Sequence, residues 1–420
     1  MNNRIELLPG IFLTAIKTDK FKTGCMSVNF LRPLCRQEAA QNALIPDVLL
    51  RGSEQHPTIK SISDELDELY GATIGTLLRK KGETQLVGLY ADFIEDRLVG
   101  EPILEKLTQF LFELLLQPSL EDGVFRKDFV ESEKRNLLNA IAASVNDKRS
   151  YAVLRLFSDM CRDEAYGVPR LGEQEDAEAI TPRSLYAQYQ RVLSASRVEL
   201  FYMGSRSAEE MAALLLPYLR KIPRTQPDAT PLTVVRRAET VRYLSETRDV
   251  TQGKLAMGFR TDCTASDKEY AALLTLCTVF GGGATSKLFL QVREKMSLCY
   301  YAGASIEQYK GVMLVSSGIE FEKYETARDE ILHQLSLCCE GVISEEELDQ
   351  AKRSLISSLT LALDSPGRMD DFYIGHAAAE LDGTVEDLRE AVERVTVEDT
   401  AAAARKITLD TVYFLKGEPA

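Results

Sequence analysis

A long internal repeat constrains the fold of this chain more than any other feature of its sequence. Residues 131–138 (ESEKRNLL) are echoed by residues 349–356 (DQAKRSLI). Each half also closes on a similar apolar run that ends in glycine, residues 198–204 (VELFYMG) and residues 411–417 (TVYFLKG). A repeat of this length indicates one structural unit that is used twice. We therefore expect two copies of a single fold.

The order of elements within the first half predicts the fold class. Short runs rich in β-branched and aromatic residues predict strands, and longer runs with helical periodicity predict helices. The strands are expected at residues 11–17, 25–32, 73–79, 84–92 and 198–203, and the helices at residues 39–51, 61–69, 101–117, 125–143, 150–164 and 181–193. Strands with one apolar face need helices to cover that face, so each unit is expected to be a two-layer α/β domain.

One segment near the middle of the chain is the best candidate for a linker. Residues 222–233 (IPRTQPDATPLT) are rich in Pro, Thr and Asp and follow neither a helical nor a strand period. A chain of 420 residues is also too long for one ordinary core. We therefore expect an N-terminal domain at residues 1–222 and a C-terminal domain at residues 223–420.

Composition excludes several classes of function. The chain has 50 basic and 64 acidic residues, a net charge of −14, which argues against nucleic acid or an anionic membrane as partner. The N-terminus lacks the features of a signal peptide, and no apolar run is long enough to span a membrane, so a cytoplasmic protein is expected. The eight cysteines show no C-x-x-C spacing and are expected to be buried thiols. The only histidines are His56, His333 and His376.

The most specific motif is the stretch FGGGATSKLFLQVREKMSLCYY at residues 280–301. Gly281, Gly282 and Gly283 are expected to end one helix, because glycine tolerates the left-handed backbone common at helix C-termini. A second helix is expected to begin near Ser286 and to carry Arg293, and a strand should carry Tyr300. A phosphate-binding loop is excluded, because such loops lead from a strand into a helix. Residue types alone favour a tight turn between helices.

The whole pattern, GGG-x-x-S-K-L-F-x-x-V-R-E-K-x-x-L-x-Y, resembles the C-terminal-half signature of the pitrilysin/insulinase metallopeptidases. The resemblance covers essentially the whole chain. It implies two homologous domains of the LuxS/pitrilysin-like metalloenzyme type, each a largely antiparallel sheet packed against helices. It also implies a substrate-binding role for Arg293, Tyr300 and the three glycines. In this family the arginine and the tyrosine lie across a chamber from a zinc ion, where they hold the substrate backbone and the developing oxyanion.

The zinc site of the family is missing from this chain. Active members carry H-x-x-E-H on a helix of the first half, followed by a short apolar run and a basic residue before glycine. Here residues 48–53 (VLLRGS) match that follow-on, so the motif positions fall on Ala43, Pro46 and Asp47. The distal zinc-binding glutamate falls on Ala140, counted from Glu133. Pro46 is also expected to kink this helix.

No other residues replace the lost ligands. His56 lies beyond Gly52, away from the helix that would hold the metal. His376 and Glu380 have i, i+4 spacing, but a lone pair of this kind more often forms a surface hydrogen bond than a metal site. We therefore expect no zinc and no cofactor on this chain, and no peptidase activity from the chain alone.

Two functions remain open at this point. The family includes heterodimers in which one subunit carries zinc and the other contributes only the Arg/Tyr pair, and this chain has the profile of the second subunit. Its partner would be a zinc-bearing H-x-x-E-H subunit, and its ligand a peptide. The alternative is a scaffold, such as a homodimer, that binds a peptide or protein without cleaving it. N-terminal motifs such as residues 17–23 (KTDKFKT) resemble a bacterial subgroup linked to aminopentanol modification of elongation factor P.

Overall fold

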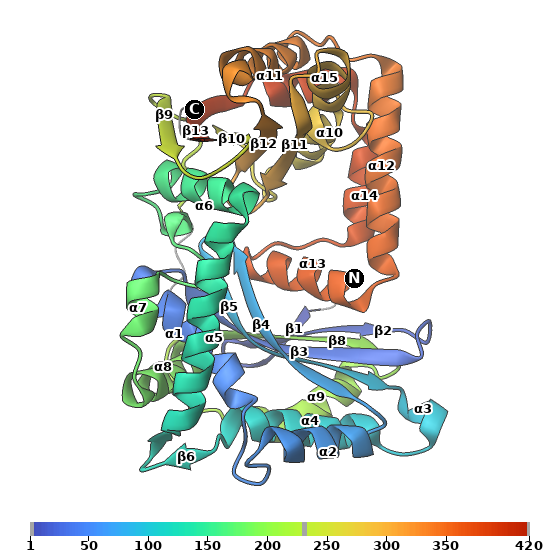
Figure 1. Cartoon of the computed structure of the whole chain (residues 1–420). Coiled ribbons are helices and arrows are strands. Elements are labelled where there is room, and N and C mark those ends of the chain that lie inside the picture. The colour runs from blue at the N-terminus through green and yellow to red at the C-terminus, as the bar shows by residue number, and fades with distance from the viewer. Residues whose placement is uncertain (1–3, 229–232, 418–420) are drawn as a thin grey trace. The chain divides into compact units, whose positions relative to one another are not determined.

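The computed structural model describes residues 4–228 and 233–417 (Figure 1). The chain forms two compact units, and each is assembled from three segments. Unit 1 comprises Met1–Ile141, Val168–Pro231 and Ser365–Asp382. Unit 2 comprises Ala142–Gly167, Leu232–Asp364 and Gly383–Ala420. Residues 229–232 of the predicted linker lie outside the described residues.

Unit 1 is built around a six-stranded sheet in the order β1-β2-β8-β3-β5-β4. Strands β2 and β8 are parallel, and the other neighbours are antiparallel. Its strands are β1 Arg4–Leu8, β2 Ile11–Lys17, β3 Thr23–Pro33, β4 Thr73–Lys81, β5 Thr84–Ile94 and β8 Arg197–Gly204, with a separate small hairpin of β6 Leu120–Glu121 and β7 Val124–Phe125. Its helices are α1 Arg36–Leu49, α2 Ile59–Glu68, α3 Asp96–Val99, α4 Ile103–Leu116, α5 Lys127–Asn146, α7 Gln174–Glu178, α8 Pro182–Ala195, α9 Ala208–Leu219 and α13 Pro366–Ala378, the last residues of α5 belonging to unit 2.

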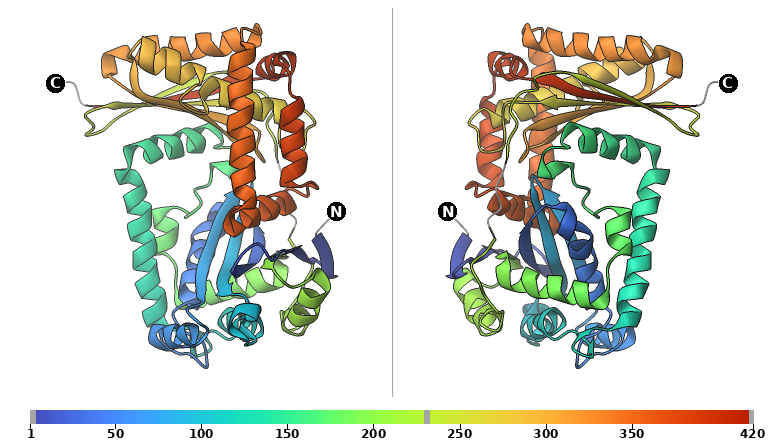
Figure 2. Two further views of the ribbon diagram at one scale, coloured as in Figure 1. Left: turned by 90° about the vertical axis from the view of Figure 1, so that its right-hand side faces the viewer. Right: turned by 90° about the vertical axis from the view of Figure 1, so that its left-hand side faces the viewer.

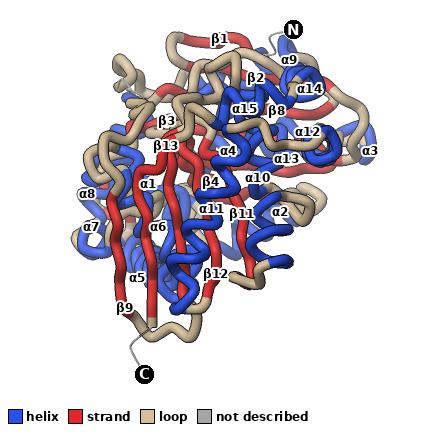
Figure 3. Tube along the Cα trace, turned by 90° about the horizontal axis from the view of Figure 1, so that it is seen from above, coloured by secondary structure: helices blue, strands red, loops and turns tan. Residues whose placement is uncertain are grey.

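Unit 2 contains a five-stranded sheet in the order β11-β12-β10-β13-β9. Figure 3 labels four of these strands, β9, β13, β12 and β11, and β10 lies between β13 and β12. The strands are β9 Arg242–Thr247, β10 Gly253–Arg260, β11 Cys299–Glu307, β12 Val312–Ile319 and β13 Thr408–Lys416. The helical elements are α6 Lys148–Met160, η1 Ala165–Gly167, α10 Tyr270–Gly281, η2 Leu288–Lys295, η3 Phe321–Lys323, α11 Tyr324–Cys339, α12 Glu345–Leu363, α14 Val385–Arg394 and α15 Val397–Ala404.

The two sheets share one topology, apart from β1. Without β1, the order across the sheet is β2-β8-β3-β5-β4 in unit 1 and β9-β13-β10-β12-β11 in unit 2. At each place the two sheets carry the strand with the same rank along its half of the chain, and it runs in the same direction relative to its neighbours. In each sheet the first pair is parallel and the next three pairs are antiparallel. The expected fold class is therefore confirmed: two repeated domains, each a largely antiparallel sheet packed against helices.

The compact units are not the two continuous domains predicted from the sequence. Helix α6 belongs to the first half of the chain but packs on β10 and β13 of unit 2, and α13 belongs to the second half but packs on β3 and β8 of unit 1. Figure 2 shows α6 and α11 on opposite faces of the five-stranded sheet. Each sheet therefore has both faces covered, one by its own half and one by a helix from the other half. The sequence cannot reveal this exchange, because an amphipathic pattern gives the buried face of a helix but not the sheet that buries it.

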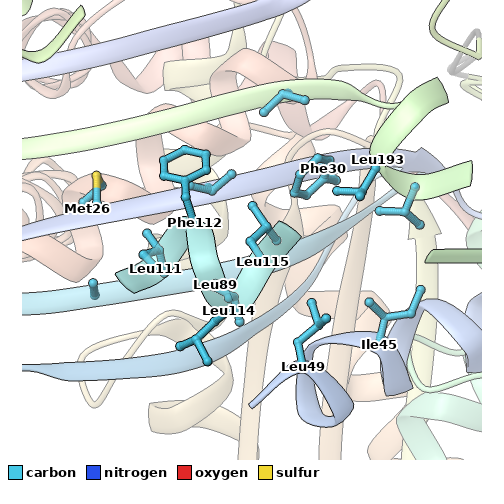
Figure 4. Close-up of a cluster of buried hydrophobic side chains, with 14 of the residues drawn as sticks. Met26, Phe30, Ile45, Leu49, Leu89, Leu111, Phe112, Leu114, Leu115 and Leu193 are labelled. Atoms are coloured by element: carbon cyan, nitrogen blue, oxygen red, sulfur yellow. The ribbon is translucent and has the colours of Figure 1, made fainter. Parts of the chain in front are cut away.

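The core of unit 1 lies between its sheet and helices α1, α4 and α8. Figure 4 shows part of this cluster, in which Met26, Phe30 and Leu89 of the sheet face Leu111 of α4 and Ile45 of α1. These five side chains are at most 2% exposed. Within the described residues, no helix is both long and apolar enough to cross a membrane.

Candidate functional site

Arg293 lies on a helical turn that is wider than the predicted α-helix. Element η2 is a π-helix, in which the backbone N–H of Met296 donates to the carbonyl of Gln291, five residues earlier, at 3.0 Å. Val292 is fully buried, whereas the side chain of Arg293 is 41% exposed. The guanidinium lies 4.5 Å from the centroid of the Phe289 ring and 3.5 Å from the carboxylate of Glu294. Wide helical turns of this kind occur frequently at functional sites.

Tyr300 projects from an irregularity at the start of β11. Cys299 pairs with Ile319 and Tyr301 pairs with Gly318, so Tyr300 is an extra residue in the ladder, a β-bulge. Its side chain is 67% exposed, the most exposed of the large hydrophobic residues described. On a regular strand the neighbouring Tyr301 is expected to face the opposite side from Tyr300 and to pack into the core, but it is not fully buried. Tyr301 is half-buried, and its ring lies 4.3 Å from the guanidinium of Arg149.

Arg293 and Tyr300 line the same cavity of unit 2. Its volume is about 460 Å³, and its remaining lining comes from Glu294, residues 297–299, Glu320 and Lys323. Lys323 pairs with Glu320 at 3.0 Å and donates to the carbonyl of Ser297 at 3.1 Å, so these lining residues are held by contacts with one another. The cavity therefore presents one weakly paired guanidinium and one exposed phenol.

The positive charge of Arg293 also affects the thiol of Cys299, the first residue of β11. Burial raises the pKa of the Cys299 thiol, and a hydrogen bond with Ser317 and the positive charge of Arg293 oppose that increase. Arg293 and Cys299 also both line the cavity. Arg293 and Tyr300 thus lie on one cavity, and their role towards a substrate stays a prediction.

The glycine triplet ends α10, but not through a left-handed backbone. The helix ends at Gly281, and Gly282 has φ −85°, so the predicted left-handed conformation is wrong. Close packing explains the glycine at position 281. A Cβ atom there would lie 2.5 Å from the backbone nitrogen of Ala304 in β11, too close for any other residue. Gly283 borders open space and makes no such contact. None of the three glycines is among the residues that line the cavity of Arg293 and Tyr300.

Helix α1 of unit 1 carries the three positions that correspond to H-x-x-E-H. Ala43 and Pro46 are buried, and Asp47 is exposed. Helix α1 continues through Pro46 to Leu49, and the Pro46 carbonyl accepts a hydrogen bond from the N–H of Leu50 at 3.2 Å. The proline lies in the last turn of a helix anchored by a buried apolar face, so the loss of one backbone donor does not end it.

The environment of Asp47 does not form a metal site. The Asp47 side chain reaches the surface, but the protein atoms around it still shield its carboxyl from water and raise its pKa; a hydrogen bond from Thr76 lowers the pKa, and the nearby Glu133 raises it further. Glu133 is itself paired with Arg51 at 3.1 Å. Ala140, at the position of the distal glutamate, is exposed on α5. Among the described residues, no group of three or more His, Cys, Asp or Glu side chains could hold a metal ion.

The histidines near these positions have other partners. His56 Nδ1 lies 2.8 Å from the carboxylate of Glu113. His376 stacks on Phe372, with its ring centroid 4.0 Å away, and Glu380 pairs with Arg197 at 2.7 Å. His376 and Glu380, which are four residues apart, therefore each contact a different residue.

We expect the purified chain to retain no stoichiometric zinc after dialysis against buffer without metal, because the four family positions offer one carboxylate and no imidazole. Metal analysis by mass spectrometry tests this, with Asp47→Ala as the comparison. Equal background zinc in both proteins agrees with the prediction. One tightly held zinc per chain that is lost in Asp47→Ala contradicts it.

Sequence reasoning missed the Glu320–Lys323 wall of the cavity. Both residues lie between β12 and α11, where a charged segment reads as an ordinary solvent-exposed loop. Nothing in their spacing from Arg293 signals proximity, because the hairpin of β11 and β12 brings them together. The β-bulge at Tyr300 was missed for the same reason, since it depends on the register with β12.

Comparison with known proteins agrees with the geometry. Residues 179–355 match the family described as peptidase M16 inactive domain. The chain is 35% identical over 410 residues to the "probable inactive metalloprotease YmfF" of Bacillus subtilis, covering 97% of this chain and 96% of that protein. It resembles the crystal structure of a conserved protein from Enterococcus faecalis, with a TM-score of 0.92, 29% identity and 99% of each chain covered.

A more distant structure shares the fold. The crystal structure of a peptidase M16 inactive domain from Pseudomonas fluorescens gives a TM-score of 0.81 at 16% identity, covering 100% of this chain and 99% of that one. Because the 35% identity to the Bacillus subtilis relative extends over nearly the full length, the chain belongs to the M16 (pitrilysin/insulinase) peptidase family as an inactive, metalloprotease-like member.

Proposed function

We propose that this chain is the non-catalytic subunit of a two-subunit zinc peptidase and contributes Arg293 and Tyr300 to the chamber of a zinc-bearing partner. One observation carries the proposal. The two side chains that the family uses to hold substrate are exposed on one cavity of about 460 Å³, although the positions that would bind zinc have been replaced. Neither side chain is needed to fill the core, so their exposure is consistent with a role towards a ligand.

The chemistry of the pair suits a peptide bond under attack. The phenol of Tyr300 can donate a hydrogen bond to the oxyanion that forms when water attacks a carbonyl, and the Arg293 guanidinium can donate to a neighbouring substrate carbonyl. The partner would bind the zinc, through the two histidines of H-x-x-E-H and a distal glutamate, and would supply the attacking water. This chain would then position the substrate and stabilise charge, and would not itself activate water.

Co-purification tests the proposal. The tagged chain is isolated from its native host, and the bound proteins are identified by mass spectrometry. We expect an H-x-x-E-H relative to co-purify in equal amounts. We further expect the mixture of the two purified proteins to cleave peptides that neither protein cleaves alone.

A scaffold role is the outcome that opposes this proposal. A homodimer that binds peptide without cleaving it, and that associates with no zinc-bearing relative, would replace the proposed function. Association with the machinery that modifies elongation factor P, without peptidase activity in the mixture, would argue for the scaffold as well.

A further inference from the structure

A second cavity lies in unit 1, among α4, the loop between α1 and α2, and the end of α9. Its volume is about 350 Å³, and it is lined by both charged and carboxamide side chains. The size falls at the lower end of the range for small-molecule sites, about 300–1,000 Å³, so it suits a small metabolite better than a folded partner. None of the residues proposed above to meet the substrate lines this cavity.

Glu113, which lines the cavity, has a buried carboxylate whose hydrogen bonds described below all reach one of its two oxygens. Glu113 is only 6% exposed. Its Oε1 accepts a hydrogen bond from the Ser53 hydroxyl and lies 2.8 Å from Nδ1 of His56. Throughout the part of the chain that the structure describes, no hydrogen bond reaches Oε2, and no lysine or arginine pairs with the carboxylate. Ser53 and His56 occupy Oε1, so Oε2 is the oxygen that can accept a further hydrogen bond, and an ammonium group in the cavity could donate one.

The rim of the cavity offers the opposite charge. Lys221 is exposed, and its ammonium group lies 5.5 Å from the centroid of the Tyr218 ring. Among the described residues, no carboxylate lies within ion-pair distance of it. Gln55, Gln109 and Gln117 also line the cavity, and their carboxamides can each donate and accept hydrogen bonds.

One wall of the cavity is aromatic. Phe112, labelled in Figure 4, stacks on Tyr218 with ring centroids 5.1 Å apart. Tyr218 is half-buried, so part of its surface remains available to an apolar group. The cavity thus combines a buried anion, a cation at the rim, uncommitted amide groups and an apolar wall.

We propose that this cavity binds a free α-amino acid. The ammonium group of the ligand would meet the free oxygen of Glu113, its carboxylate would meet Lys221, and its side chain would lie along Tyr218. A metal ion fits less well, because Glu113 is the only acidic, histidine or cysteine side chain that lines the cavity and Lys221 would repel a cation.

Isothermal titration calorimetry on the full chain tests the site, with each standard amino acid offered at up to about 10 mM, a concentration that detects dissociation constants in the millimolar range. We expect at least one amino acid with an apolar side chain to bind once per chain. Its N-acetyl derivative lacks the ammonium group and its amide lacks the carboxylate, so each should bind about tenfold more weakly or worse.

Variants of the protein give the matching test. Glu113→Gln should weaken binding of the amino acid about tenfold or more, and Lys221→Met should do so without any risk to folding, because Lys221 is exposed. Lys60→Met, at an exposed lysine of α2 that does not line the cavity, serves as the control and should bind normally. The proposal is overturned if no amino acid binds, if the N-acetyl derivative binds as well as the parent compound, or if Lys221→Met binds unchanged.

Discussion

Replacing Glu164 by alanine should lower the free energy of unfolding by about 3–5 kcal/mol, the scale expected when one partner of a buried ion pair is removed. Glu164 accepts hydrogen bonds from the guanidinium of Arg260 at 2.6 and 3.1 Å, and the ammonium group of Lys310 lies 2.7 Å from it. The side chains of Arg260 and Lys310 are 2% and 0% exposed. The substitution would leave Arg260 and Lys310 buried without this carboxylate, although Asp410 would still pair with Arg260 and the Thr233 carbonyl would still accept a hydrogen bond from Lys310.

Urea unfolding followed by circular dichroism measures this change, and Asp163→Ala is the matched control. Asp163 is the adjacent carboxylate, but its side chain is 88% exposed, so its removal should change stability by about 0.5 kcal/mol or less. A change of similar size in both variants would mean that the buried cluster contributes nothing specific to the stability of unit 2.

The pH dependence of the same cluster gives an independent test. Burial alone would raise the pKa of Glu164, but its hydrogen bonds with Arg260 and Lys310 outweigh that effect and lower it. A carboxylate with a lowered pKa in the folded state stabilises the protein above its unfolded pKa, near 4.3, and that contribution is lost as the pH falls below this value. The stability difference between the natural protein and Glu164→Gln should therefore shrink as the pH falls from about 5 to 3.

The repeat predicted most of the fold but not its exchange of helices. The strand predicted at residues 11–17 coincides with β2, and the repeated closing strands β8 and β13 occupy equivalent places in the two sheets. Helix α6 was also predicted, yet it was assigned to the wrong unit. Its buried residues Tyr151 and Leu156 pack against Ala256, Tyr413 and Leu415 of unit 2. Periodicity identifies such a buried face, but only tertiary packing decides which sheet covers it.

Buried charges were the second feature hidden from sequence reasoning. Arg260 and Lys310 lie on or beside strands of unit 2, where a charged residue normally indicates a solvent-facing position. Their burial is possible because Glu164 arrives from the other half of the chain, and this pairing has no signature in local sequence. The cavity of Arg293 and Tyr300 was predictable for the opposite reason, since a short contiguous motif carries both residues.

The largest expected effect on function comes from Tyr300 and Arg293 in the reconstituted complex of this chain with its proposed zinc-bearing partner. Tyr300→Phe and Arg293→Ala should each lower turnover about 100-fold, the scale of losing one donor to an oxyanion. Tyr300 is 67% exposed, the Arg293 side chain is 41% exposed, and neither fills the core, so folding and association with the partner should stay nearly unchanged. Tyr301→Phe is the matched control, because Tyr301 is the adjacent tyrosine, lies half-buried against Arg149 and should retain normal turnover.

If Tyr301→Phe abolished turnover and Tyr300→Phe did not, the wrong tyrosine would have been assigned. If an active complex tolerated all three changes, this chain would act only as a scaffold, because a subunit that stabilises the transition state cannot lose its donors without a loss of rate.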